Sequence, residues 1–340
     1  MGPEYFCFPR RWAGKPAVQV HVFVAPLSPD IEIKPALARG AVGRLQRTSV
    51  IAEENGALAA VNGSFFNRAR PYVPVGLLAI DGKILAKSLL ERSAIGITAS
   101  NEVVFGMPKF TGHIINDSTG EKIPVWGINR PRKENEAIIY TPEYGISTKT
   151  NKNGVELIIE NDMVVGISEG SSPIPENGYV ISFHGWTKNY ANELPPGAKL
   201  TVTYKLADGW DKYDHVLTGG PRLVHGGRIV VQNSLYHEDF GGDVFGRNAR
   251  TAVGLSRNNE IILVVVEGRK YRSRRSRRTG ATYQELAQLM QDLGAVEAIG
   301  LDGGGSSSMY VKGRGMVSAP SEGSEQSVSN ILMIRQKNTQ

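Results

Sequence analysis

Residues 298–310 read A-I-G-L-D-G-G-G-S-S-S-M-Y, which is a short apolar run followed by one acid, three glycines and three serines. The mostly apolar run from Ala295 to Leu301 predicts a buried strand that ends in the carboxylate of Asp302. Successive glycines let a ligand approach the main chain closely, and their N–H groups can form an anion-binding concavity. A flexible Gly/Ser connector is the alternative, but such linkers rarely begin at a buried strand and resume as one. The stretch therefore predicts a binding site around Asp302.

Composition sets the outer bounds of the protein. The 340 residues are enough for one large domain or two ordinary ones, and 41% hydrophobic with 21% charged residues is typical of soluble globular proteins. No apolar run reaches the length of a membrane-spanning helix, and the N-terminus shows no secretory signal pattern. The single cysteine, Cys7, excludes an internal disulfide and a cysteine-cluster metal site. The formal charge of +6 mildly favours anionic partners.

A second strand-to-loop segment repeats the plan of the first. A helix over 48–55 and the apolar strand Ala57 to Val61 lead into Asn62-Gly63-Ser64, just as a helix with the capping box Thr282-x-x-Glu285 precedes the strand before Asp302. A hairpin turn is the ordinary meaning of Asn-Gly, but the next strand candidate begins only at Gly76. We therefore expect Asn62 and Asp302 at equivalent strand ends.

Two further strands end in residues suited to a site. Val216 and Leu217 lead into Thr218-Gly219-Gly220-Pro221, and the unbroken apolar run 261–266 ends at Glu267. A surface glutamate that caps a strand is the alternative for Glu267. In α/β sheets ligands bind outside the carboxyl ends of strands, and by this analogy one edge would gather Asn62, Thr218, Glu267 and Asp302.

The distribution of these patterns predicts an α+β (mixed α/β) fold, with a central mixed β-sheet core flanked by helices and an inserted β-rich subdomain. Short strands and turn pairs dominate the middle of the chain, and helical periodicity is weak there. We expect residues 1–111 to form the N-terminal half of the core, 112–213 the insertion and 214–340 the C-terminal half. Strands over 19–24 and 31–35 are predicted to pair.

Two charged segments have ordinary interpretations beside functional ones. In residues 269–278, seven of ten residues are cationic, which indicates either a solvated loop, a loop that overhangs the cleft and attracts polyanions, or nucleic-acid binding. The acidic segment 237–243 favours a solvated loop, with a bound divalent cation such as Ca2+ as the alternative. The sequence names no cofactor and no metal ligands, and the common phosphate-loop, dinucleotide, nucleophile-elbow and zinc-protease motifs are absent.

Five segments, in order, resemble the phosphodiester glycosidase family: V-N-G-S-F-F-N at 61–67, T-G-G-P-R-L-V at 218–224, R-T-A-V-G at 250–254, V-V-E-G-R at 265–269 and L-D-G-G-G-S-S-S-M at 301–309. The similarity extends over about residues 18–335. The chain departs from the family pattern at Gly300, where Asn is common, at Glu267, where Asp is common, and in the arginine-rich segment after Gly268.

The resemblance implies hydrolysis of the bond between sugar C1 and a phosphate, on an exopolysaccharide, teichoic-type or other phosphate-containing envelope glycan, by an extracellular or cell-envelope protein. Asp302 and Glu267 would supply the carboxylates. Phosphate and sugar would be bound by residues from all five segments, namely Asn62, Ser64, Thr218, Gly219, Arg250, Arg269, Gly303, Gly304, Gly305, Ser306 and Ser307. The rival interpretations are a non-catalytic module that binds an anionic wall polymer and, ranked below it, a nucleic-acid-binding protein.

Overall fold

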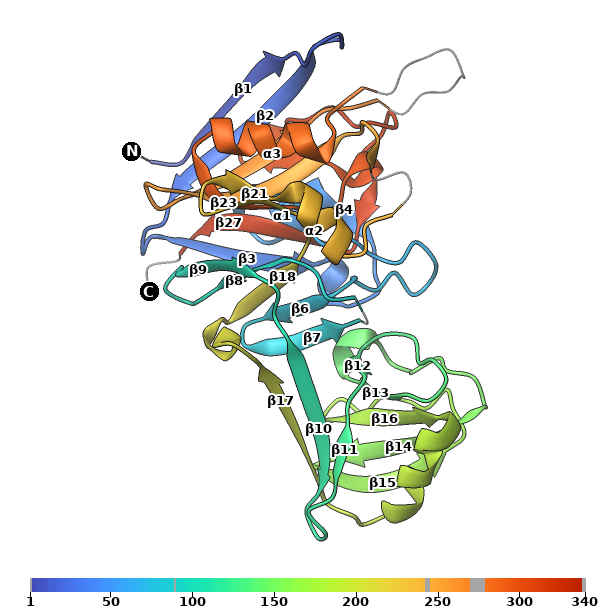
Figure 1. Cartoon of the computed structure of the whole chain (residues 1–340). Helices are drawn as coiled ribbons and strands as arrows, with labels where there is room; N and C mark the ends of the chain where they lie inside the picture. Colours follow the sequence, from blue (N-terminus) through green and yellow to red (C-terminus); the bar gives the residue numbers. More distant parts are fainter. Residues whose placement is uncertain (1, 89, 242–244, 270–278, 338–340) are drawn as a thin grey trace.

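The computed structural model describes residues 2–88, 90–241, 245–269 and 279–337 (Figure 1). Two packed sheets form its core. The seven-stranded sheet has the order β1 (Glu4–Arg10), β2 (Val18–Pro26), β22 (Glu260–Val266), β21 (Arg250–Ser256), β23 (Ala295–Gly300), β19 (Arg222–His225) and β20 (Arg228–Ile229). The five-stranded sheet has the order β25 (Gly315–Met316), β24 (Met309–Val311), β5 (Ala57–Asn62), β27 (Asn330–Gln336) and β3 (Ile31–Leu37).

Helices cover the outer faces of these two sheets. The largest buried cluster, which includes Phe23, Val61, Leu263 and Leu332, lies between the sheets. A second cluster packs α2 (Val231–His237) and α3 (Tyr283–Asp292) on the other face of the seven-stranded sheet. A third packs α1 (Thr48–Glu54) on the five-stranded sheet. Strand β22 is therefore buried on both faces, which explains its unbroken apolar sequence.

The remaining strands lie in two larger units and one short pair. A ten-stranded sheet has the order β15 (Met163–Ser168), β14 (Gly154–Glu160), β16 (Gly178–His184), β13 (Ala137–Tyr140), β12 (Gly127–Ile128), β7 (Lys83–Lys87), β6 (Leu77–Ile80), β18 (His215–Thr218), β8 (Ala94–Ile97) and β9 (Val103–Gly106). A three-stranded sheet has the order β11 (Lys122–Pro124), β10 (Phe110–Asn116) and β17 (Leu200–Leu206), and β26 (Ser327–Val328) pairs with β4 (Gln46–Arg47). Short 3-10 turns cover residues 38–40, 142–144, 185–193, 210–212 and 304–306.

Residues between β10 and β17 reach away from the core. Figure 1 shows β10 and β17 running side by side toward the end of the molecule that holds β14, β15 and β16. These strands have their own buried cluster, which includes Leu157, Ile181 and Phe183. The ten-stranded sheet nevertheless continues from them into β6–β9 through the pairing of β12 with β7. The exact boundaries at residues 112 and 213 stay a prediction.

The broad α+β class agrees with this architecture, but the expectation of a single mixed sheet was wrong. Two sheets pack face to face, and among the described strands only β12 and β13 pair in parallel. Strands β2 and β3, predicted as partners, lie in different sheets, where β2 pairs with β1 and β22 while β3 pairs with β27. The partners β22 and β27 are distant in sequence, so short-range turn signals could not reveal them.

Local predictions for the helices were confirmed. Helix α3 begins with a capping box, in which the Glu285 amide donates to Thr282 Oγ1 (3.2 Å) and the Thr282 amide to Glu285 Oε2 (2.9 Å). Helix α1 ends one residue before Asn55, and each of these helices leads directly into a strand of a core sheet. Within the described ranges, no helix is both long and apolar enough to cross a lipid bilayer.

Candidate functional site

The Asp302 loop is held from both sides by the end of β5. Asn62 Nδ2 donates to the Asp302 carbonyl oxygen (2.6 Å), and the Asp302 amide donates to the Gly63 carbonyl (3.1 Å). The other end of the Asn62 amide, Oδ1, accepts from Thr251 Oγ1 (2.7 Å) and from the Ser308 amide (3.2 Å). The predicted pairing of the Asn62 and Asp302 strand ends is thus present, and it joins the two core sheets.

The glycines of the loop are used mainly by the protein itself. The Gly303 amide donates to Asp302 Oδ1 (2.9 Å), and Gly304, in the left-handed region at φ +64°, donates to the Ala249 carbonyl (2.8 Å). The Ser306 amide donates to the Gly303 carbonyl (3.3 Å), so three of the four amides at 303–306 already donate to groups of the protein. The predicted cradle of phosphate-binding N–H groups at 303–306 is therefore largely occupied. A phosphate here needs side-chain cations.

The electrostatic setting of Asp302 suits acid–base chemistry. Burial raises the pKa of the Asp302 carboxyl to about 6, against the opposing effects of hydrogen bonds from the Ser306 side chain and the Gly303 amide and of the positive charge of Arg68. A carboxylate with a pKa near working pH can exchange protons efficiently, and strongly perturbed groups cluster at functional sites.

One arginine acts directly on this carboxylate, and two more lie near the Gly303 backbone and the Tyr283 ring. Arg68 lies in an exposed loop close enough for its charge to act on Asp302. Arg250 is 4% exposed, and its guanidinium lies 3.9 Å from the centre of the Tyr283 ring and 3.6 Å from where a Cβ on Gly303 would be. Arg92 lies 3.9 Å from the centre of the Phe240 ring, and its charge reaches Tyr283. The sequence analysis found Arg250 but missed Arg68, Arg92 and Tyr283.

Two serine hydroxyl groups beside Asp302 lack partners. Ser64 is 2% exposed and Ser307 is 4% exposed, and neither Oγ has a hydrogen-bond partner among the residues that the structure describes. Buried hydroxyl groups are nearly always hydrogen-bonded in native proteins, to protein, water or ligand. Both residues flank the clamp between β5 and the Asp302 loop, and their predicted contact with a substrate stays a prediction.

Glu267 is oriented by a histidine that the sequence analysis did not find. Its Oε1 accepts from His21 Nε2 (2.9 Å) and from the Ala319 amide (2.7 Å), and the other ring nitrogen of His21 contacts Tyr5 Oη (2.9 Å). Burial raises the pKa of Glu267, but these hydrogen bonds and the charges of His21 and Arg269 outweigh it, so the net pKa is lowered. Glu267 therefore stays ionised. His21 could have been found as a polar residue inside the apolar strand 18–26.

The loops that carry Glu267 and Asp302 meet at one segment, Asn248–Ala249. A Cβ on Gly268 would lie 2.4 Å from the Ala249 nitrogen, and the Gly304 amide bonds to the Ala249 carbonyl. Strands β22 and β23 both pair with β21, so their ends emerge at the same edge. The predicted convergence of these two loops is thus visible in the backbone.

Asn62, Thr218 and Gly219, which were predicted to bind phosphate and sugar, form bonds within the protein. Asn62 is fully buried, with its amide committed to the clamp described above. Thr218 Oγ1 accepts from the Leu77 amide and donates to the Leu77 carbonyl (both 2.9 Å). Gly219 donates to the Ser93 carbonyl (2.8 Å), and a Cβ there would lie 2.3 Å from the Gly300 carbonyl oxygen. All three residues therefore connect the segments around the Asp302 loop to one another through hydrogen bonds within the protein.

Arg269 is exposed, and its amide donates to Thr279 Oγ1 (2.8 Å). Its charge acts on Glu267, which places it at this edge. The rest of the arginine-rich segment, residues 270–278, lies outside the described residues, so its predicted position over the cleft stays a prediction.

The described part of the acidic segment, residues 237–241, is not simply a solvated loop. Glu238 is 3% exposed, and its carboxylate accepts from the Ser93 amide and hydroxyl (both 2.8 Å) and from the Arg222 amide (2.9 Å), as well as from Ser234 Oγ. These donors fill the carboxylate and leave it unsuited to Ca2+. It anchors the T-G-G-P loop instead, since a Cβ on Gly220 would lie 2.3 Å from Glu238 Oε2.

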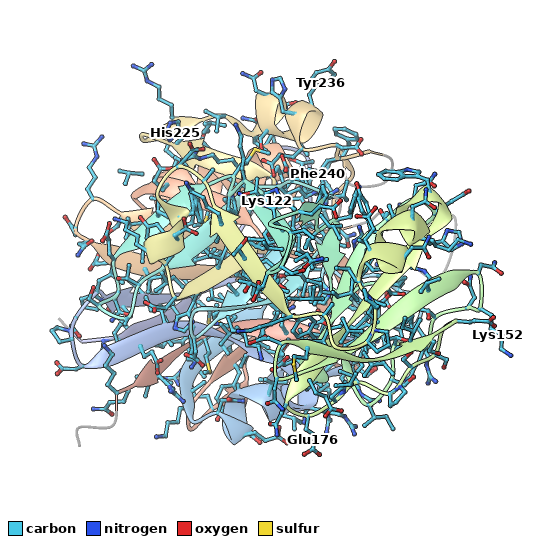
Figure 2. The ribbon with its side chains drawn as sticks, turned by 90° about the horizontal axis from the view of Figure 1, so that it is seen from below. Lys122, Lys152, Glu176, His225, Tyr236 and Phe240 are labelled. Carbon is cyan, nitrogen blue, oxygen red and sulfur yellow. The ribbon has the colours of Figure 1, made fainter. Side chains whose placement is uncertain are left out.

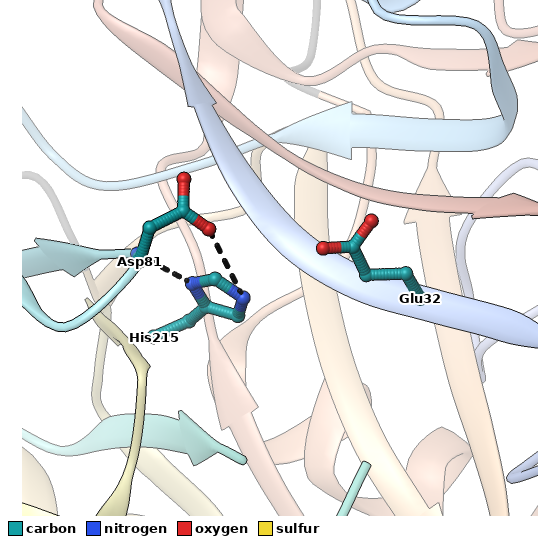
Figure 3. A group of neighbouring side chains, drawn as sticks. All are labelled: Glu32, Asp81 and His215. Carbon is teal, nitrogen blue, oxygen red and sulfur yellow. Dashed lines mark hydrogen bonds and ion pairs between the residues drawn. The ribbon is translucent and has the colours of Figure 1, made fainter. Parts of the chain in front are cut away.

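Glu32, Asp81 and His215 form another acidic group at metal-ligand spacing (Figure 3). Lys34 Nζ lies 2.8 Å from Asp81 Oδ1 and 3.7 Å from Glu32 Oε1, and Arg335 Nε lies 2.6 Å from Glu32 Oε2. Burial lowers the pKa of His215. Since two cations already compensate both carboxylates, this group fits an internal ion-pair network better than a metal site.

Replacing Asn62 by Ala is expected to lower the free energy of unfolding by about 2–4 kcal/mol, because the buried Asp302 carbonyl and Thr251 hydroxyl lose their partners. Chemical denaturation measures the change. Asn153→Ala, at an exposed turn, is the control and should change stability little. Equal stability of the two variants would contradict the role of the clamp.

Comparison with known proteins identifies related sequences. The family model for phosphodiester glycosidases matches residues 153–335, more than half of the chain. An uncharacterised protein of Rickettsia conorii is 26% identical over 231 residues, covering 64% of this chain and 77% of that protein. The mouse N-acetylglucosamine-1-phosphodiester alpha-N-acetylglucosaminidase is 26% identical over 161 residues, covering 44% of this chain and 30% of the enzyme.

Solved structures share the fold. A hypothetical protein from Synechocystis superposes with a TM-score of 0.85 at 26% identity, covering 99% of this chain and 62% of that one. An exported protein, so described, from Burkholderia pseudomallei gives 0.78 at 25% identity, with coverage of 95% and 75%. The zebrafish N-acetylglucosamine-1-phosphodiester alpha-N-acetylglucosaminidase catalytic domain gives 0.56 at 16% identity, with coverage of 98% and 84%, and shows the fold alone. With the family model matching most of its second half, the chain belongs to the phosphodiester glycosidase family.

Proposed function

We propose that this protein hydrolyses the C1–O bond of a sugar-1-phosphodiester in a phosphate-containing envelope glycan. The observation that carries the proposal is Asp302, a carboxyl group of raised pKa beside the cation of Arg68, two unpartnered buried hydroxyl groups and the loop of Glu267. The family and the printed activity of the mouse relative support the reaction class. The exported Burkholderia neighbour supports a site of action outside the cytoplasm.

Asp302 and Glu267 have different roles in the proposed reaction. The bond from C1 to the bridging oxygen breaks, the departing phosphate keeps the electron pair, and water adds to C1. Asp302, in its ionised form, accepts the water proton. Glu267 stays ionised and stabilises positive charge that develops on the sugar ring in the transition state.

The arginines compensate the negative charge of the departing phosphate. A phosphate next to Asp302 would be repelled by the carboxylate unless a cation lies between them. Arg68 supplies that charge from the exposed side, while Arg250 supplies it from beneath the Gly303 backbone. Because a phosphate is a good leaving group, preorganised positive charge contributes more here than a strong general acid.

Turnover decides between an enzyme and a non-catalytic binding module. Purified protein is incubated with an α-linked N-acetylglucosamine 1-phosphodiester bearing a methyl aglycone, and with teichoic-type and capsule fragments, and released reducing sugar is measured. Sugar release from at least one diester is expected, and it should stop in Asp302→Asn. Release of sugar 1-phosphate and the aglycone alcohol, which leaves the C1–O bond intact, or no turnover on the whole panel, would contradict the proposal.

A further inference from the structure

The molecule has a large cavity beside the Asp302 loop that none of the proposed catalytic groups line. Its volume is about 970 Å3, at the upper end of the range for ligand pockets, and therefore larger than one sugar phosphate needs. Its walls come from both core and middle segments of the chain: residues 39–45 and 70–72, Ser327, and residues from Pro131 to Asn151.

The lining is strongly basic. Five cations line the cavity, namely Arg39, Arg44, Arg70, Arg132 and Lys149, and the described lining contains no aspartate or glutamate. Across the residues that the structure describes, none of the five forms an ion pair. The charge of Glu156 acts on Arg132, so the other four cations carry the excess positive charge of the cavity. The formal charge of the whole chain is only +6, so this is a local concentration of positive charge. Like charges gathered in a concave surface raise the local concentration of anions.

One of these cations is held in place by the protein. Arg132 Nη1 donates to Ser182 Oγ (2.7 Å) and to the Phe183 carbonyl (3.1 Å), while Nη2 donates to Asn151 Oδ1 (2.9 Å). Thr150 and Asn151 add polar groups to the same wall. A fixed guanidinium costs less conformational entropy on binding than a free one, so the wall is preorganised for an anionic, hydroxyl-rich ligand.

Two chain segments connect this cavity to the Asp302 site. The loop closed by the bond from the Asn67 amide to the Val73 carbonyl (2.9 Å) carries both Arg68, which acts on Asp302, and Arg70, which lines the cavity. In the second segment, a Cβ on Gly305 would lie 3.3 Å from Gln326 Cγ, and the next residue, Ser327, lines the cavity. A ligand that leaves the site along these segments would enter the cavity.

We infer that the basic cavity binds further phosphate groups of the substrate, and that the substrate is a polyanionic glycan whose sugars are joined through phosphodiesters. This inference rests on the proposed function for the reaction at Asp302, but the binding of the polyanion does not. Several cations without acids match repeated negative charges along one chain, whereas a small diester would reach only the Asp302 site.

The test uses the double variant Arg44→Gln/Lys149→Gln in the full chain. Both side chains are exposed cavity cations that take no part in the Asp302 clamp described above. The control, Lys122→Gln/Arg228→Gln, removes the same charge from exposed positions outside the cavity. Figure 2 shows His225, in the hairpin that holds Arg228, on the other side of the molecule from Lys152, which follows the cavity residue Asn151. A charge-retaining variant, Arg44→Lys/Lys149→Arg, checks that folding is kept.

Binding is measured by titration calorimetry with inorganic polyphosphate over a range of salt concentrations, and turnover with an oligomer of N-acetylglucosamine 1-phosphate and with its methyl diester. The cavity variant should bind polyphosphate about tenfold more weakly than the control, with a salt slope reduced by about 1–2. Its kcat/KM should fall by a similar factor on the oligomer and stay unchanged on the methyl diester. The charge-retaining variant should behave like the wild type.

The outcomes separate this inference from the proposed function. Equal polyphosphate binding by the cavity variant and the control overturns the cavity assignment whether or not the protein is an enzyme. An equal loss of kcat/KM on the methyl diester also overturns it, because the cavity would then hold the reacting phosphate. Weaker binding by the cavity variant with no turnover of any diester supports the cavity and refutes the proposed reaction.

Discussion

Asp302→Asn is expected to lower kcat on a sugar-1-phosphodiester by about 10²–10⁴-fold, the range for loss of a positioned proton acceptor. Asn keeps an oxygen that can accept from the Gly303 amide, so the loop should keep its shape. Steady-state assays of released sugar measure the effect. Asp292→Asn, which changes an exposed carboxylate paired with Arg10, is the matched control and should retain full activity. Comparable activity in the two variants would remove Asp302 from the mechanism.

The raised pKa of Asp302 also fixes a pH dependence. Since the reaction needs the ionised carboxylate, kcat should rise with pH and level off, with a midpoint near the pKa of about 6. The effect on stability has the opposite sign. The folded pKa lies above the ordinary value of 3.8, so ionisation of Asp302 destabilises the fold progressively as pH rises from about 4 to above 6.

Asp302→Asn should consequently be at least as stable as the wild type at pH 8, by up to about 3 kcal/mol, with the difference shrinking toward pH 4. Thermal unfolding at the two pH values measures it. A variant that loses both activity and stability at pH 8 would indicate a structural carboxylate. This combined readout distinguishes a group retained for chemistry from one retained for folding.

Glu267→Gln is expected to reduce kcat by about 10²-fold or more, because a neutral amide cannot stabilise positive charge on the sugar ring. Gln can still accept from the Ala319 amide, so the loop position should survive. Glu267→Asp, which keeps the charge on a shorter side chain, should recover part of the activity. Because the pKa of Glu267 is lowered, the low-pH limb of the Glu267→Asp profile should keep its midpoint near 6.

Glu260→Gln is the control for this comparison, because Glu260 lies at the opposite end of the same strand and contacts Ser256 Oγ (2.9 Å). It should leave kcat unchanged. If Glu267→Gln matched this control, the bonds of Glu267 to His21 and Ala319 would be purely structural.

The sequence predicted the parts of the site that depend on local pattern. A carboxylate directly after a buried strand and a capping box before a helix are signals carried by neighbouring residues, and Asp302 and α3 lie where they were expected. The bonds that depend on packing were not predicted. Asn62 and Thr218 were predicted to bind phosphate and sugar, but both side chains form bonds within the protein, which only the register between distant strands could reveal.

The same limit explains what was missed. Arg68 and Arg92 belong to no recognisable sequence motif. The charge of Arg68 acts on Asp302 and that of Arg92 on Tyr283 only because the chain folds these segments together. The prediction of a single mixed sheet was wrong for a related reason. Helix-then-strand segments at both ends of the chain are typical of parallel sheets, yet here they add one strand each to two antiparallel sheets.

The bond from Asn62 to the Asp302 backbone spans 240 positions of sequence. Neither the first nor the last third of the polypeptide alone therefore contains a complete reaction centre. Under the proposed function, a nascent chain would show no hydrolysis until its C-terminal strands had docked. Two separately produced fragments, divided within the middle region, would regain hydrolysis only on reassociation, which offers a direct route to a split reporter.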